Sequence, residues 1–138
     1  MQKFFFLLLS ILISFSYSEA QSNFNLQIKV KGIDKVKGNI RVCILKSKKD
    51  FPENCWRAKV IKVEERKMTI LFDDIPKGEY AISIFHDENK DAKLNKNFFG
   101  IPTEDYGFSN NPKIRFGPPD FKECAFKVYS DKVITIDL

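Results

Sequence analysis

The chain has 138 residues, with 23 Lys or Arg against 18 Asp or Glu and a net charge of +5 at neutral pH. This length suits one domain with a hydrophobic core of its own. The basic residues are scattered and form no stripe interleaved with aromatic side chains, which excludes a nucleic-acid-binding protein.

The first segment is typical of a secretory signal peptide. Lys3 supplies a positive charge, residues 4–13 form an apolar run, and residues 18–20 read Ser-Glu-Ala, with small side chains where signal peptidase requires them. The run is shorter than the roughly 20 apolar residues of a transmembrane helix, although an uncleaved anchor is the alternative. We therefore expect residues 1–20 to be removed. Residues 21–138 should form one exported domain, periplasmic, on the cell surface or secreted, with no transmembrane segment.

Alternation of apolar and polar side chains dominates the rest of the chain and predicts short β-strands. Turn residues separate these strands, and we expect hairpin turns within residues 32–38, 64–67 and 73–78. The only helical expectation is one turn near residues 119–124. The pattern predicts an all-β fold, a two-sheet antiparallel sandwich of about seven strands. The expected strands cover residues 24–30, 40–44, 58–64, 68–72, 80–85, 126–128 and 134–138.

Three cysteines follow the signal segment, at positions 43, 55 and 124. Export permits a disulfide, and three thiols allow one bridge and one leftover. Cys43 and Cys55 lie close in the sequence, where a bridge joins a strand to the loop after it, and this is the pair that we favour. Three reduced thiols are the alternative.

Residues 87–120 show no alternation, and a loop of this length in a compact domain is often functional. Its beginning matches the start of an EF-hand-type calcium loop, in which alternate oxygen ligands converge on the cation. The match departs at Ala92, where glycine is usual, and at Phe98, where a bidentate glutamate is usual. The expected ligands are the side-chain oxygens of Asp87, Asn89, Asp91 and Asn95 and the main-chain carbonyl of Lys93.

Two carboxylates and two amides would hold calcium weakly, in the range of extracellular modules. The main alternative is a set of Asx turns, in which the same oxygens accept backbone N–H groups without any metal. Another cation or ligand is the third interpretation of this segment.

His86 is the only histidine and stands between a predicted strand and the loop. It is either a base or ligand, or a structural side chain bonded at the strand end. A Ser-His-Asp set with Ser109 and Asp105 has no nucleophile elbow and no glycine-rich oxyanion turn to support it.

The segment of residues 106–111 combines aromatic and amide side chains. Such a patch suits the binding of a sugar or a peptide. Alternatively, Tyr106 and Phe108 plug the end of the sandwich, and Gly107 permits a tight turn. The expected binding surface consists of His86, Glu104, Tyr106, Phe108 and Asn110.

Residues 78–89 read GEYAISIFHDEN, residues 99–111 read FGIPTEDYGFSNN, and residues 117–121 read GPPDF. Over about residues 26–138, the chain resembles a bacterial family known as domain of unknown function 2141. The resemblance implies an exported protein with a small sandwich of immunoglobulin or transthyretin type. The family loop, HDeNgNGklD, is closer to a calcium loop, because this chain has Asp, Ala and Asn at positions 91, 92 and 95 where the family tends to have Asn, Gly and Asp.

The family has no established function, so the resemblance implies no activity. The sequence favours a binding or cell-envelope accessory module rather than an enzyme. We expect a calcium-stabilised loop at residues 87–97, a contact surface within residues 98–120, and an extracytoplasmic ligand or envelope component as partner. Two alternatives remain: a small hydrolase that uses His86 with Asp87 or Asp105, and a structural domain without a ligand.

Overall fold

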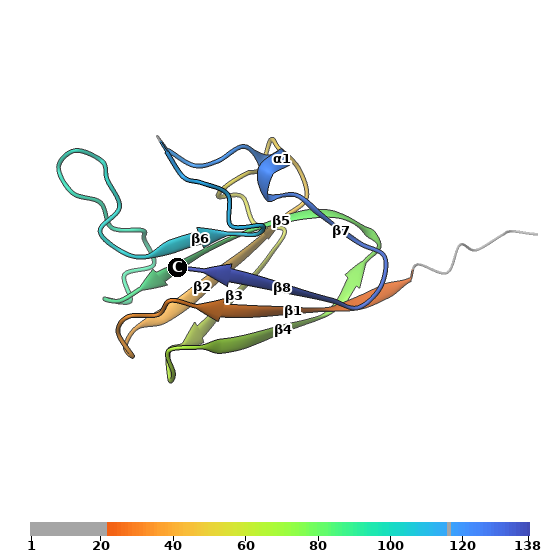
Figure 1. Ribbon diagram of the computed structural model, residues 1–138, viewed down its shortest axis with the longest axis horizontal. Helices are drawn as coiled ribbons and strands as arrows, with labels where there is room; N and C mark the ends of the chain where they lie inside the picture. Colours follow the sequence, from red (N-terminus) through yellow and green to blue (C-terminus); the bar gives the residue numbers. More distant parts are fainter. Residues whose placement is uncertain (1–21, 116) are drawn as a thin grey trace, which may run out of the picture.

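The computed structural model describes residues 22–115 and 117–138, and the predicted signal peptide lies outside them. Within this part of the chain, eight strands form two sheets (Figure 1). One sheet has the order β4-β1-β8, and the other has the order β3-β2-β5-β6, with β7 also paired to β5. The predicted all-β, two-sheet class is confirmed. The elements are β1 (Asn23–Lys31), β2 (Asn39–Leu45), β3 (Arg57–Lys62), β4 (Met68–Pro76), β5 (Gly78–Asp87), β6 (Tyr106–Phe108), α1 (Phe121–Cys124), β7 (Phe126–Val128) and β8 (Lys132–Asp137).

The core fills the space between the sheets and consists of the side chains that alternation places on one face of each strand. Leu26, Ile28 and Val30 of β1 are fully buried, while the residues between them are more exposed. Each apolar side chain of this size contributes about 1.5–3 kcal/mol when it is buried. The described core residues lie between Leu26 and Ile136, and Phe24 and Leu138 pack against them.

The three turns that we expected to form hairpins instead carry the chain from one sheet to the other. Residues 32–38 lead from β1 to β2, residues 63–67 lead from β3 to β4, and Lys77 alone separates β4 from β5. The hairpin prediction is therefore wrong at all three places. Turn residues show where the chain reverses, but the hydrogen-bonded neighbour of a strand depends on how the two sheets pack.

One strand pair is parallel, whereas the sequence predicted an antiparallel sandwich. β1 and β8 run in the same direction, with Ile28 opposite Ile134 and Val30 opposite Ile136. Because the chain has crossed between the sheets before β8, β8 pairs with the edge of β1 that β4 leaves open and runs parallel to it. The first two strands lie in different sheets, unlike the immunoglobulin constant-type order, in which they share one.

β6 is a strand that the sequence analysis missed, because three residues are too few for alternation to show. It pairs with residues 83–85 of β5. A Cβ atom on Gly107 would lie 2.7 Å from the carbonyl oxygen of Asp137, so β6 and β8 pass very close to each other. Asn111, just after β6, links this segment to β8: its side chain accepts from Asp137 N at 3.0 Å and donates to Thr135 O at 3.2 Å.

β3 and β4 are edge strands of the two sheets, and basic side chains of β3 bridge them. Arg57 donates to the Asp73 carbonyl at 2.6 Å, and Lys59 donates to the Leu71 carbonyl. These bonds occupy carbonyl groups on an edge that would otherwise be open to pairing with another chain.

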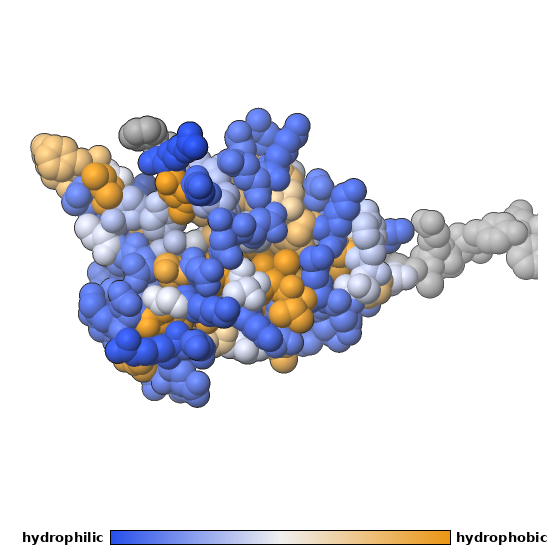
Figure 2. All heavy atoms as spheres, in the orientation of Figure 1, coloured by the Kyte–Doolittle hydropathy of each residue, from blue (hydrophilic) through white to orange (hydrophobic). Residues whose placement is uncertain are grey.

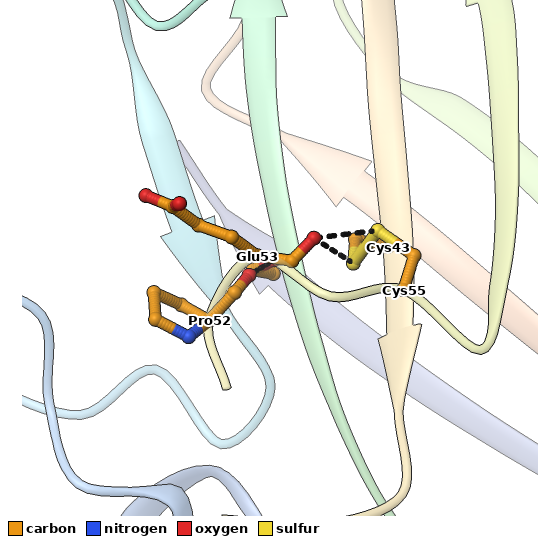
Figure 3. The surroundings of a disulfide bond; sticks show 5 residues. Cys43, Pro52, Glu53 and Cys55 are labelled. Atoms are coloured by element: carbon orange, nitrogen blue, oxygen red, sulfur yellow. Dashed lines mark hydrogen bonds between the residues drawn. A yellow bond between two sulfur atoms is a disulfide. The ribbon is translucent and has the colours of Figure 1, made fainter. Parts of the chain in front are cut away.

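The predicted disulfide between Cys43 and Cys55 is confirmed. It ties β2 to the loop of residues 46–56, with the two Cα atoms 5.1 Å apart, and the Glu53 carbonyl oxygen lies 3.4 Å from Cys55 Sγ (Figure 3). A disulfide indicates an oxidising compartment. Cys124 is buried and unpaired, and burial raises the pKa of its thiol to about 12, which keeps the thiol protonated.

The disulfide loop and α1 cover part of the outer face of the five-stranded sheet. The ring of Phe51 packs 5.6 Å from that of Phe108 and 6.0 Å from that of Phe121. Ser83 donates its hydroxyl to the Pro52 carbonyl at 2.9 Å. The helical turn expected near residues 119–124 is present as α1, and no helix in the described ranges is long and apolar enough to span a bilayer.

Phe72→Ala should destabilise the domain by about 3–5 kcal/mol, because this side chain is 1% exposed and its loss leaves a cavity. Leu71→Ala is the matched control, since the neighbouring side chain is 53% exposed, and it should cost less than about 1 kcal/mol. Urea unfolding of residues 22–138, followed by Trp56 fluorescence, measures both losses. Equal losses would contradict the assignment of the two faces of β4.

Candidate functional site

The long loop, residues 88–105, joins β5 to β6 and begins at a buried carboxylate. Asp87 is fully buried, and its Oδ2 lies 2.5 Å from Arg41 Nε on the adjacent strand β2. The same carboxylate accepts the backbone N–H groups of Asp91 and Ala92, each at 3.1 Å. A carboxylate that is buried in this way needs such partners, and they bind the first turn of the loop to the sheet.

Asp91 organises the next turn. Its Oδ1 accepts the backbone N–H of Lys93 at 2.9 Å, and its Oδ2 accepts the side-chain amides of Asn89 at 3.1 Å and Asn95 at 3.0 Å. These bonds, first that from Asn95 and then that from Lys93, hold the pKa of the Asp91 carboxyl below its usual value.

Glu104 connects the two ends of the long loop. Its carboxylate is nearly buried and accepts the backbone N–H groups of Glu88 at 2.9 Å and Asn95 at 3.0 Å. The side chain of Glu88 turns the other way and pairs with Lys37 at 2.9 Å and Lys35 at 3.0 Å, both in the connection between β1 and β2. These two lysines lower the pKa of the Glu88 carboxyl.

The residues predicted to bind calcium are arranged as Asx turns. Asp87 is buried against Arg41. Asn89 accepts the backbone N–H of Asp91 with its side-chain oxygen at 3.1 Å, and the side-chain amides of Asn89 and Asn95 donate to the Asp91 carboxylate. Ala92 has a φ of 68°, a left-handed conformation that glycine adopts more easily. Across residues 22–115 and 117–138, no three His, Cys, Asp or Glu side chains are grouped to hold a metal ion. Calcium binding stays a prediction of the sequence alone.

His86 is fully buried at the end of β5. Its Nε2 lies 2.7 Å from the Lys37 carbonyl oxygen and therefore donates to it, and its backbone N–H donates to Asp105 O at 2.8 Å. Ser109 is also fully buried, and its hydroxyl donates to Cys124 O at 2.5 Å. Neither side chain reaches solvent, and each is bonded to a main-chain carbonyl, as the structural alternative for His86 states.

The predicted binding surface is mostly interior. Glu104 and Phe108 are buried like His86, and Tyr106 is half-buried beside Phe108, with ring centroids 6.0 Å apart. Asn110 is exposed, but its amide donates to the carbonyls of Glu123 and Ala125. Phe108 and Tyr106 pack in the cluster on the outer face of the five-stranded sheet, whereas the plug alternative placed them at the end of the sandwich. His86 alternates with the core residues of β5 and lies on its inner face.

The exposed apolar feature of the long loop is its tip, residues 97–101. Phe98 is 98% exposed, Phe99 is 83% exposed and Ile101 is 59% exposed. The loop projects from the body of the domain in Figure 1, and its apolar end stands out beyond polar neighbours in Figure 2. The sequence places Phe98 within the expected contact surface of residues 98–120, but it shows this residue otherwise only as a departure from the calcium-loop pattern. The sequence signal for an exposed tip was the cluster of Phe98, Phe99 and Ile101 in a segment without strand alternation.

The backbone of the tip is held by its own hydrogen bonds. The Asn97 side-chain oxygen accepts the N–H groups of Phe99 at 2.9 Å and Ile101 at 3.1 Å. Asn97 N donates to Ile101 O at 2.8 Å, and Thr103 N donates to Asn95 O at 2.8 Å. Gly100, with a φ of 77°, provides the left-handed residue of this turn. The two phenylalanines are therefore exposed on an ordered hairpin.

A family model of an uncharacterized protein conserved in bacteria, DUF2141, matches residues 28–137. The chain belongs to this family. The resemblance seen in the sequence is thereby confirmed, and the DUF2141 match encloses the long loop and its tip. Comparison with curated proteins found no match, and neither did comparison with solved structures.

Arg41→Met should destabilise this DUF2141 domain by about 2–3 kcal/mol, because it leaves the buried charge of Asp87 without its cation. The expected loss is smaller than the roughly 3–5 kcal/mol of fully buried pairs, since 26% of the Arg41 side chain is exposed. Lys62→Met is the control, because it breaks the exposed pair with Glu64 and should cost less than about 1 kcal/mol. Urea unfolding distinguishes the two. A small loss for Arg41→Met would contradict the role given to the pair.

Asp91→Asn should lower the melting temperature near neutral pH but not in acid. The pKa of Asp91 is lowered on folding, so its stabilisation is present above the unfolded pKa of about 4 and is lost as pH falls through the folded pKa. The difference between wild type and variant should therefore shrink below about pH 4. Glu65→Gln, on an exposed turn, should follow wild type throughout. A difference that persists at about pH 2 would contradict the assignment.

Calcium provides a direct test of the two interpretations of the loop. If the oxygens serve as Asx-turn acceptors, millimolar calcium after EDTA treatment should change the melting temperature of residues 22–138 by less than about 1 °C. A saturable rise that Asp91→Asn abolishes would establish a calcium site instead.

Proposed function

We propose that this DUF2141 protein is an exported binding module of the cell envelope and that the tip is its contact element. The observation that carries the proposal is the near-complete exposure of two adjacent phenylalanines, Phe98 and Phe99, on an ordered hairpin. Apolar side chains gathered at one exposed place in a soluble domain mark a surface that another component covers.

The way the loop is held also supports this role. Binding elements lose less conformational entropy when they are ordered beforehand. Here the bonds of Asp87, Asp91 and Glu104 with backbone amides link the tip to the strands of a disulfide-bonded sandwich. A rigid scaffold that presents a loop is a common design for recognition.

The proposal is tested by fractionating cells that produce the full chain. Phe98→Ser/Phe99→Ser should reduce the envelope-associated fraction at least about tenfold, because two large apolar contacts are lost. Leu71→Ser/Val133→Ser removes two other exposed apolar side chains, each 53% exposed, and should leave the distribution unchanged. Unchanged envelope association of the tip variant would refute the contact role.

A further inference from the structure

We infer that the component covering the tip is an anionic phospholipid bilayer, into which Phe98, Phe99 and Ile101 insert while neighbouring lysines contact the headgroups. This inference rests on the proposed function, because it identifies what the same tip binds. It adds a stated ligand chemistry and a docking orientation to that function.

The shape of the tip favours a bilayer over a folded protein. A stable protein interface buries about 800 Å² on each partner and involves about 20–30 residues. The tip offers three apolar side chains on one projecting turn, and the exposed Lys96 beside it is charged. A bilayer needs no complementary shape and receives a convex apolar element as it is.

The charges around the tip favour an anionic surface. Lys90, Lys93 and Lys96 are all exposed in the part of the loop that precedes the tip. Of the nearby carboxylates, Asp87 is buried against Arg41 and Glu104 is nearly buried. Exposed basic side chains beside an apolar element are attracted to anionic headgroups, and their long stems follow the apolar surface while the amines stay in water.

The other acidic groups of this loop lie farther from the tip along the chain than Lys96 does, and Asp105 is half-buried. Glu88 is paired with Lys35 and Lys37, and Asp91 has hydrogen bonds from two side-chain amides and one backbone amide. The partners of Asp91 are neutral amides, so this exposed carboxylate keeps its charge and offsets Lys93. Lys96, the charged residue next to the tip in the sequence, therefore carries the attraction to an anionic surface.

The order of the tip lets it insert without rearrangement. The rings of Phe98 and Phe99 are nearly perpendicular, with centroids 5.6 Å apart. The N–H groups of Phe99 and Ile101 already have the Asn97 side-chain oxygen as acceptor. These backbone donors therefore need no water when the turn enters the interface, where unpaired polar groups are costly.

The test uses residues 22–138 with sucrose-loaded vesicles of phosphatidylcholine, alone or with about 30 mol % phosphatidylglycerol. We expect sedimentation to show binding to the anionic vesicles at least about tenfold stronger than to the neutral ones, falling with salt. Phe98→Ser/Phe99→Ser should abolish it, and Leu71→Ser/Val133→Ser should not. Lys93→Gln/Lys96→Gln should weaken binding at least about fivefold, whereas Lys29→Gln/Lys31→Gln, on β1, should leave it unchanged.

Insertion is measured separately with Phe98→Trp. Anionic vesicles should shift the emission of the new indole to the blue, and lipids brominated on their acyl chains should quench it. The same substitution at Leu71 is the control and should show neither effect. Urea midpoints equal to wild type confirm that the variants are folded.

Several outcomes overturn the inference. They are absence of vesicle binding, equal binding to both vesicle types, binding that the tip variant retains, and a dimer that only the tip variant loses. If vesicles are not bound but envelope association of the full chain still requires Phe98 and Phe99, the contact role stands and its partner is a protein. If the tip variant stays on the envelope, the proposed function itself fails.

Discussion

The long loop depends on the compensation of one buried charge. Asp87 ends β5 with its carboxylate out of solvent, and Arg41 on the adjacent strand together with two backbone amides provides the partners that such a group requires. Because both charged residues belong to paired strands, the sheet determines where the amides of Asp91 and Ala92 must lie. The loop thus takes its initial direction from the sheet and accepts left-handed backbone at Lys90 and Ala92 in doing so.

Beyond Asp87, hydrogen bonds from side-chain oxygens to backbone amides continue along the loop as far as its apolar tip. Asp91 and Glu104 bind further backbone amides, and Asn97 does the same at the turn that carries Phe98. The side-chain oxygens of these residues accept backbone amides of the loop, while Phe98 and Phe99 face solvent. In this acidic segment the carboxylates accept backbone N–H groups of the loop itself. These hydrogen bonds fix the loop that carries the apolar tip.

The limits of sequence reasoning appear at particular residues. Seven strands were recognisable because alternation extends over several residues, whereas β6, with Gly107 at its centre, is too short to alternate. The turn residues were recognised, but they join different sheets, since a turn does not specify the neighbour of a strand. The oxygen spacing from Asp87 onward fits both metal ligands and Asx turns, and only the position of Arg41 across the sheet distinguishes Asp87 as a buried, paired carboxylate.

Local pattern alone was enough for the all-β class, most strand positions, and the choice of Cys43 and Cys55 as the bonded pair. These properties follow from side-chain period or from short separation along the chain. The tertiary structure decided the parallel pairing of β1 with β8, the burial of His86 and the exposure of Phe98. Exposure depends on which distant segments cover a residue. Two phenylalanines of the same long irregular region, Phe98 and Phe108, therefore differ completely: Phe98 is exposed and Phe108 is buried.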